Sequence, residues 1–305
     1  MADWLSNRRA IVTGAARGIG FAVAQSLALL GARVLMVDNG CAVDGTAEDP
    51  AVTELAAGRV PGAVPLVIDL AAPGSGARVV EAACEAFGGV DLIVHAAGVI
   101  TPRDGSLHGR AAFEHVARVD LYAAIELLDA AVPLMQAQVR DGRLPGAIVT
   151  LVSAEAAYGD PELWAEAASK AALLSLTRSL SHRLAASGIG CNAVIPMAGT
   201  RQVDARLRYG AEREAHHRLM KPLAPSCVAN LIAWLCTPLA AGITGQLYMA
   251  RGREILIFSQ ARPADSFFQS QLFEPDELAQ SMRAIRRELT DDWTAIDAFG
   301  NDPVP

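Results

Sequence analysis

The sequence predicts an α/β protein in which a doubly wound, seven-stranded parallel sheet carries helices on both faces. Short apolar runs alternate with longer amphipathic ones along the 305 residues, which is the pattern of parallel strands joined by crossover helices. The apolar runs are nearly continuous stretches of Val, Ile, Leu and Ala, as expected for strands covered on both faces. The length allows one large domain, which we place at residues 1–252.

The runs locate the individual elements. The predicted strands are Ala10–Thr13, Val34–Val37, Pro65–Ile68, Leu92–His95, Ala147–Val152, Cys191–Ile195 and Gln246–Ala250. The predicted helices include Phe21–Leu30, Ser75–Phe87, Ala111–Gln136, Leu163–Ala186 and Ser226–Leu235. From Arg253 on the alternation ends and charged residues become more frequent. We therefore predict a C-terminal extension at residues 253–305, with one helix at Asp276–Leu289, that packs on the domain or on a partner subunit.

Composition and charge exclude several classes of partner. The formal net charge is −7, so no basic field attracts nucleic acid or an anionic membrane surface. Residues 1–9 are polar, unlike a secretory leader, and no run reaches the ~18 apolar residues of a membrane span. The five cysteines are scattered, which predicts free thiols in a cytoplasmic protein. Because no Cys/His cluster is present, no metal site is expected.

The first strand leads into a glycine-rich turn and then a helix, in the run Ala-Ile-Val-Thr-Gly-Ala-Ala-Arg-Gly-Ile-Gly at residues 10–20. Gly14 allows the tight turn, Gly18 lets the backbone approach a pyrophosphate, and Gly20 lets helix and strand pack closely. The helix start offers free N–H groups and a positive dipole end to the anion. This run therefore predicts a Rossmann-type dinucleotide site.

An acid at the end of the second strand indicates which dinucleotide binds. Asp38 lies about 20 residues beyond the turn, where a carboxylate binds the ribose hydroxyls. Its charge would repel a 2′-phosphate, so NAD(H) is favoured over NADP(H). Arg17 modestly favours NADP(H) instead, because its guanidinium could bind such a phosphate.

Motifs along residues 5–250 resemble, in order, those of the short-chain dehydrogenase/reductase family. They are Thr13-Gly14-x-x-x-Gly18-x-Gly20, Asp69, His95-Ala96-Ala97-Gly98, Ser153, Ala168-Ser169-Lys170-Ala171-Ala172, Asn192–Pro196 and Gly245-Gln246. The resemblance implies a small-molecule substrate and a homodimer or homotetramer built through the helices at 111–136 and 163–186. The cofactor-binding residues it implies are Thr13, Gly14, Arg17, Gly18, Ile19, Gly20, Asp38, Asp69, Leu70, Ala96, Ala97, Gly98, Lys170, Pro196 and Thr200.

Residues 196–201, Pro-Met-Ala-Gly-Thr-Arg, and 234–236, Trp-Leu-Cys, resemble the hydroxyacyl-CoA dehydrogenase branch of the family. That branch implies an acyl-type or polyketide-like ketone. The reaction expected from the resemblance is oxidoreduction of a small or medium apolar alcohol or ketone.

The active site departs from the family pattern at the acid/base position. Counting back four residues from Lys170, the place of the family's tyrosine holds Glu166, whereas Ser153 keeps the family spacing. Asp120 falls in the stretch of the family's helix asparagine, and His95 replaces the first asparagine of the strand-end motif. The resemblance implies that Ser153 orients a substrate oxygen and that Lys170 contacts the nicotinamide ribose.

A glutamate in that place changes the acid–base chemistry. A carboxyl starts near pKa ~4.3 and needs burial to raise its pKa before it can donate a proton near neutrality. Glu166 and Lys170 form an i, i+4 pair, so we expect a salt bridge that lowers the pKa of Glu166. Reduction would then be handicapped, whereas oxidation or removal of an acidic C–H proton suits a carboxylate.

These residues are compatible with three functions. Glu166 is the acid/base of an altered redox reaction, or Glu166, His95 or Asp120 is the base of a non-redox isomerase, cyclase, dehydratase or lyase. The third alternative is an inactive binding or scaffold protein. Tyr158, in the cleft loop, either supplies a replacement phenol or only packs. The candidates for substrate contact or for a solvated surface are Glu155 and the arginines of the lid after strand six, Arg201, Arg206, Arg208, Arg213 and Arg218.

Overall fold

The computed structural model describes residues 3–101, 109–160, 162–207, 212–261, 274–277 and 280. Its sheet has the order β3-β2-β1-β4-β5-β6-β7-β8 within these residues. The strands are β1 Arg9–Thr13, β2 Arg33–Asp38, β3 Val64–Val67, β4 Leu92–His95, β5 Ala147–Leu151, β6 Gly190–Met197, β7 Leu247–Arg251 and β8 Glu254–Phe258. The first seven strands are parallel to their neighbours, which confirms the doubly wound parallel sheet.

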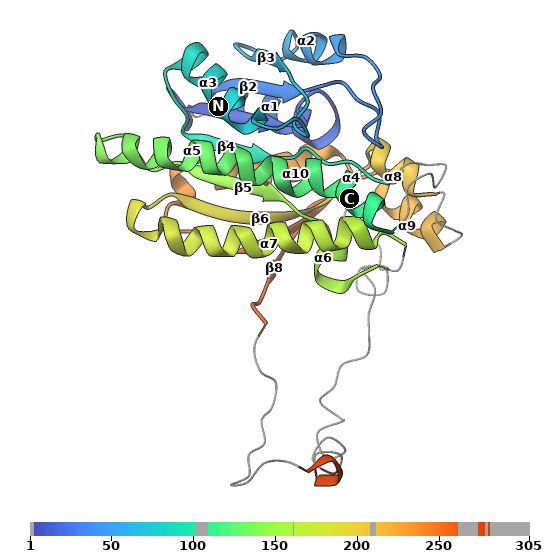
Figure 1. Ribbon diagram of the computed structural model, residues 1–305. Coiled ribbons are helices and arrows are strands. Elements are labelled where there is room, and N and C mark those ends of the chain that lie inside the picture. The colour runs from blue at the N-terminus through green and yellow to red at the C-terminus, as the bar shows by residue number, and fades with distance from the viewer. Residues whose placement is uncertain are drawn as a thin grey trace.

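The helices cover both faces of this sheet (Figure 1). They are α1 Gly18–Leu29, α2 Ala51–Ala57, α3 Ser75–Phe87, α4 Gly109–Ala117, α5 Ala123–Arg140, α6 Glu155–Tyr158, α7 Trp164–Leu184, α8 Arg201–Arg206, α9 Glu212–Met220 and α10 Pro225–Leu235. One apolar cluster joins the sheet to α1, α2 and α10, and another joins it to α3, α5 and α7. Between α4 and α5 the chain makes one π-helical turn, Arg118–Tyr122.

The eighth strand is a difference from the predicted sheet. β8 is antiparallel to β7, with Arg251 opposite Glu254, and the two-residue turn between them starts at Gly252, whose φ is +57°. A glycine can take this left-handed conformation at little cost, so Gly252-Arg253 closes a hairpin. The prediction ended the sheet at Ala250 and the domain at residue 252, and therefore missed β8. The predicted helix at 276–289 lies outside the described residues except for a few positions.

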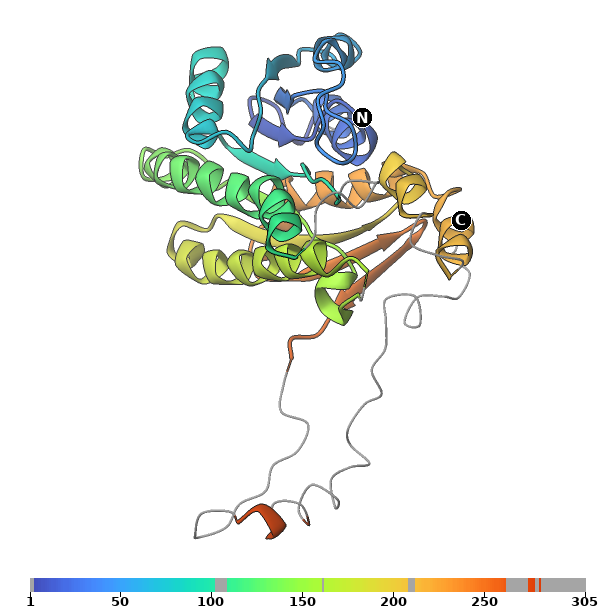
Figure 2. The ribbon, with the colours of Figure 1, turned by 45° about the vertical axis from the view of Figure 1, so that its right-hand side comes forward.

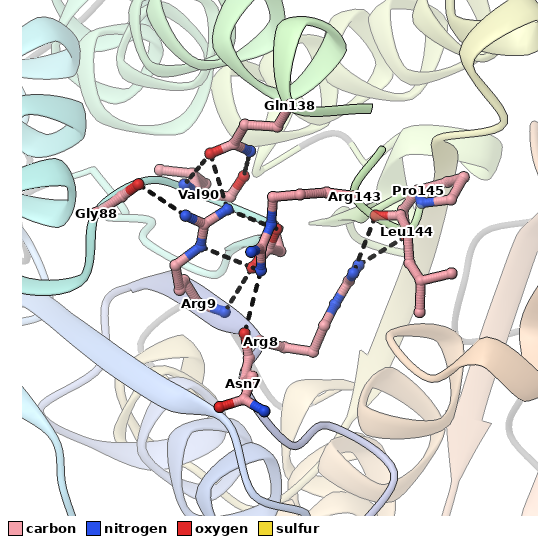
Figure 3. A network of polar contacts seen from close by, with 10 residues as sticks. Asn7, Arg8, Arg9, Gly88, Val90, Gln138, Arg143, Leu144 and Pro145 are labelled. Carbon is pink, nitrogen blue, oxygen red and sulfur yellow. Dashed lines mark hydrogen bonds and ion pairs between the residues drawn. The ribbon is translucent and has the colours of Figure 1, made fainter. Parts of the chain in front are cut away.

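Connections at the two ends of the strands serve different purposes. At the amino ends, the Arg9 guanidinium donates to both oxygens of Asp91 at 2.8 Å, and Arg143 joins the same carboxylate at 3.1 Å. Gln138 accepts a further bond from Arg9, and Arg8 donates to the carbonyls of residues 144 and 145 (Figure 3). This network ties β1, the start of β4 and the end of α5 together. The carboxyl ends carry α8 and α9 instead (Figure 2).

Candidate active site

A cavity of about 620 Å³ opens at the carboxyl ends of the strands, where doubly wound folds bind their ligands. Its lining contains every residue predicted to bind the cofactor except Thr13. Of the predicted catalytic residues, the lining contains Ser153, Glu166, Lys170 and Asp120. The sequence motifs therefore meet in one place, although they are spread over some 190 residues of the chain.

The glycine-rich turn is tight enough to need its glycines. Gly14 has φ +64° and Gly18 has φ +55°, and a Cβ atom on Gly14 would lie 2.8 Å from the Cα atom of Ala97. A Cβ atom on Gly20 would clash with the Gly14 carbonyl. These contacts explain the spacing, and they leave a bare backbone and a helix start facing the cavity. Such a cradle fits a dinucleotide pyrophosphate.

Asp38 is fixed at the same end of the cavity. Its carboxylate accepts the N–H of Ala16 at 3.0 Å and the N–H of Gly40 at 2.8 Å. Two backbone bonds hold the side chain in place while it lines the cavity. A carboxylate oxygen accepts more than one hydrogen bond, so Asp38 retains capacity for ribose hydroxyls.

Arg17 already has an acidic partner in the structure. Its guanidinium lies 3.1 Å from Glu48 and donates to the Cys41 carbonyl at 3.0 Å. Arg201 donates to that same carbonyl at 2.8 Å. Glu48 could not be placed at the cofactor end from sequence spacing, because the segment between β2 and α2 has no periodic pattern, and Arg201 was named only among the arginines of the lid.

His95 is buried and does not line the cavity. Its Nδ1 lies 3.0 Å from Thr13 Oγ1, which also accepts the N–H groups of Ala96 and Ala97 at 3.2 Å. With two bonds accepted, the Thr13 hydroxyl donates its own proton to Nδ1, which assigns the ring proton to Nε2. Burial, with Lys170 nearby, lowers the pKa of His95 to about 3. His95 is therefore neutral and joins β1 to β4, which does not favour a role as base.

Lys170 pairs with Asp120, and the predicted Glu166–Lys170 salt bridge is wrong. The Lys170 ammonium lies 2.9 Å from Asp120 Oδ2, and Oδ1 of the same carboxylate accepts the Val99 N–H at 2.9 Å. Asp120 is only 1% exposed, and a carboxylate this deeply buried needs a cation. Burial raises the pKa of Asp120, although Lys170 and the Val99 N–H act against that rise.

Glu166 instead pairs with Arg206, at the end of α8. Arg206 Nη2 lies 2.5 Å from Glu166 Oε1, and Nη1 lies 2.8 Å from Glu155 Oε1. Glu155 is buried and the side chain of Arg206 is only 12% exposed, so neither belongs to a solvated surface. Sequence reasoning named this arginine among five but had no signal to single it out.

The second oxygen of Glu166 is buried and makes no hydrogen bond with the described residues, and the buried hydroxyl of Ser153 faces Glu155, whose pKa it helps to lower, without a hydrogen bond of ordinary geometry. Burial raises the pKa of Glu166 to about 7, and Glu155 and Asp120 add to the rise against Arg206 and Lys170. This reverses the lowered pKa expected from the sequence. A carboxyl with a pKa near 7 can both donate and accept a proton near neutrality.

Tyr158 ends α6 and packs against the apolar cluster that contains Val152 and Leu173. It is not among the residues that line the cavity, so its position does not favour the replacement phenol.

Two lining residues that the sequence did not indicate are His115, whose Nε2 lies 2.6 Å from the Asp44 carbonyl, and Gln202, which donates to the Gly98 carbonyl at 2.9 Å. Arg208 and the side chain of Arg213 lie outside the described residues, and Arg218 is exposed.

Comparison with known proteins decides the family. Residues 14–252 match the family model described as enoyl-(acyl carrier protein) reductase. The chain belongs to the short-chain dehydrogenase/reductase family. It is therefore an enzyme of the oxidoreductase type that this family represents, and members of the family bind NAD(P)(H).

Relatives in this family carry several names. An L-rhamnose 1-dehydrogenase (NAD(P)(+)) of Azotobacter vinelandii is 33% identical over 81% of this chain and 96% of its own. A hydroxyacyl-CoA dehydrogenase of Mycobacterium tuberculosis is 28% identical over 92% of this chain and 88% of its own. The solved structure of a 3-ketoacyl-(acyl-carrier-protein) reductase from Brucella melitensis, complexed with NADH, has a TM-score of 0.70 at 26% identity, covering 82% of this chain and 98% of that one. No helix in the described part is long and apolar enough to cross a membrane.

Proposed function

We propose that this protein is an NAD(H)-dependent oxidoreductase that interconverts a small or medium apolar alcohol and its ketone, with Glu166 as the acid/base. The observation that carries the proposal is that Ser153 and Glu166 line one cavity, where Glu166 Oε2 is buried without a hydrogen-bond partner among the described residues and Ser153 Oγ is buried beside Glu155. Buried polar atoms of this kind need a hydrogen-bonding group. A substrate oxygen bound between them would supply it.

Each residue has a defined task in this proposal. Ser153 donates to the substrate oxygen, and Glu166 gives it a proton during reduction or takes the hydroxyl proton during oxidation. Bound NAD(H) would supply or accept the hydride. The glycine-rich turn and Asp38 would hold that cofactor, and Lys170 would lie at its ribose. A pKa near 7 for Glu166 suits both directions near neutral pH.

The apolar part of the lining supports an uncharged substrate. Met197, Val203 and Met220, which belong to one apolar cluster, line the cavity. The nearby Arg206 is already paired with two carboxylates, so it has no charge left for an anionic substrate. The resemblance to acyl-type dehydrogenases agrees with an apolar ketone.

Deuterium transfer tests this function directly. Wild-type protein, E166Q and the exposed control E162Q are incubated with a panel of ketones and with NADH labelled at either face of the nicotinamide. We expect transfer to a ketone with wild type and E162Q, and a rate at least ~100-fold lower with E166Q, since a positioned acid contributes about 10²–10⁴ in rate. Unchanged transfer by E166Q would remove Glu166 from the chemistry. Proton exchange between a substrate C–H and solvent, without deuterium transfer, would favour the non-redox alternative.

A tyrosine at residue 166 provides a second comparison. If E166Y gains carbonyl reduction that the wild type lacks, the altered-redox role of Glu166 loses its support. Binding of neither NADH nor NADPH would leave a cofactor-free catalyst or a scaffold protein.

The cofactor preference and the assembly are part of the same proposal. The fixed Asp38 and the pairing of Arg17 with Glu48 support NAD(H) over NADP(H). Exposed Ile125 of α5 and Trp164 of α7 support a homodimer or homotetramer built through these helices. The five free thiols support a cytoplasmic protein.

A further inference from the structure

Arg206 forms a bridge between two carboxylates that come from different helices. Its two terminal nitrogens bind Glu155 of α6 at 2.8 Å and Glu166 of α7 at 2.5 Å. The three side chains are exposed by only 12%, 4% and 7% for Arg206, Glu155 and Glu166. The planar guanidinium has its donors in a fixed fork, so one side chain can hold both acids at once.

The charges of this cluster do not balance when every member is ionised. One guanidinium faces two carboxylates, and the adjacent Lys170 is already matched by Asp120. An unmatched charge in a buried site is costly, and the usual relief is protonation of one acid. Arg206 keeps the pKa of Glu155 below its ordinary value in spite of burial, whereas the pKa of Glu166 is raised to about 7. The proton therefore goes to Glu166, whose Oε2 makes no bond with the described residues.

We propose that Arg206 and Glu155 act as a pair of positioning residues that set, in opposite directions, how readily Glu166 gives up its proton. The proposal rests on the proposed role of Glu166 as acid/base. Arg206 favours the ionised carboxylate by attraction, and Glu155 favours the protonated carboxyl by repulsion. Arg206 alone would leave Glu166 a poor acid, and Glu155 alone would leave it a poor base.

The bridge also links the acid to the lid. Arg206 is the last residue of α8, whose first residue, Arg201, is held at the cofactor end by the Cys41 carbonyl. A movement of α8 would therefore change the charge beside Glu166. The charged groups that face the bridge of Arg206, Glu155 and Glu166 are Lys170 of α7, Asp120 of the π-helical turn, His216 of α9 and Asp160, which follows α6.

The test is an infrared titration that needs neither substrate nor cofactor. The carbonyl stretching band of protonated Glu166 is identified by its loss in E166Q, and its pH midpoint is then measured in wild type, R206M and E155Q. We expect a midpoint near pH 7 in wild type, a rise of about one unit or more in R206M, and a fall of about one unit in E155Q. The midpoint of R206K, which keeps the positive charge but not the paired donors of the guanidinium, should lie between those of wild type and R206M.

A charge-balanced variant guards against misfolding. R206M/E155Q removes one cation and one anion together, and its midpoint should lie between those of the two single variants. Midpoints that move in the same direction in R206M and E155Q, or that do not move, would overturn the proposal, since a merely structural bridge gives no opposed pair of shifts.

The outcome can be separated from that of the proposed function. If E166Q still transfers deuterium while the opposed midpoints are found, the catalytic role of Glu166 fails and the electrostatic bridge stands. If E166Q loses deuterium transfer but the midpoints do not move, the catalytic role of Glu166 stands and the electrostatic bridge fails. Where activity is found, the pH optimum for reduction should move up in R206M and down in E155Q.

Discussion

The Lys170 ammonium lies 2.9 Å from Asp120 Oδ2, with the two side chains exposed by only 8% and 1%. Asp120 sits on the π-helical turn between α4 and α5, and Lys170 lies one turn after Glu166 on α7. The pair therefore fixes the wall of the cavity in which the lysine is expected to meet a nicotinamide ribose. It also removes Lys170 from Glu166, which leaves Arg206 as the cation that Glu166 binds.

D120A should destabilise the protein strongly. Removing one member of a buried ion pair leaves the other charge without a partner, which costs about 3–5 kcal/mol in free energy of unfolding. Urea unfolding of D120A measures this loss. D204A is the matched control, because the exposed Asp204–Lys221 pair should contribute less than about 1 kcal/mol. Equal losses in the two variants would contradict a special role for the Asp120–Lys170 pair.

D91A should weaken the opposite end of the sheet, and mainly above acidic pH. Although burial raises the pKa of Asp91, Arg9 and Arg143 outweigh burial and hold it below its ordinary value of 3.8. An acid with a lowered folded-state pKa stabilises the fold above its unfolded pKa, and the contribution is lost as the pH falls through the folded-state value. We expect a loss of about 3–5 kcal/mol at pH 7 that shrinks as the pH falls below the ordinary value of 3.8. The exposed control D141A should change stability little at either pH.

The pH dependence of stability should also report Glu166. Its folded-state pKa of about 7 lies above its ordinary value of 4.5, so the folded protein binds the proton more tightly than the unfolded chain does. The resulting stabilisation is complete below pH 4.5 and is lost as the pH rises to about 7. E166Q should therefore flatten the fall in unfolding free energy between these pH values. A fall of the same size in E166Q and wild type would exclude Glu166 as its source.

E48Q should shift the cofactor preference toward NADPH. The carboxylate of Glu48 pairs with Arg17 at 3.1 Å and lies 3.8 Å from Arg201, so its neutralisation frees positive charge for a 2′-phosphate. Fluorescence titration should show tighter NADPH binding by E48Q, with NADH binding nearly unchanged. D38A should instead lose at least about tenfold in NADH affinity, since a hydrogen bond to a charged group contributes about 1.5–3 kcal/mol. If E48Q leaves both affinities unchanged, Arg17 and Arg201 do not reach the phosphate.

I125D should disrupt the proposed assembly. Ile125 of α5 is 42% exposed and lies on one of the helices expected to form the subunit contact. Light scattering should find a dimer or tetramer for wild type and a smaller species for I125D, because a buried unpaired carboxylate is costly. The control I257D changes an isoleucine on β8 that is 69% exposed. Dissociation by I257D instead of I125D would move the contact to the edge of the sheet.

The parallel sheet and the glycine turn could be predicted because their signals are local. The first seven strands overlap the predicted runs, and α1 begins at Gly18 as the turn requires. β8 was missed because its hairpin signal, Gly252-Arg253 between apolar strands, fell where the crossover pattern had ended. β8 pairs antiparallel with β7 through a hairpin, whereas the other strands were located from the pattern of parallel strands joined by crossover helices.

What the sequence determined by itself is the fold class, the cofactor cradle and the set of residues that gather at one edge of the sheet. These follow from periodicity and from the steric needs of Gly14 and Gly20 at close approach. The tertiary structure alone decided which charges are partners. Glu166 is four residues from Lys170, yet its cation is Arg206, 40 residues away, because buried charges are matched by the packing of several helices and not by their spacing along one of them.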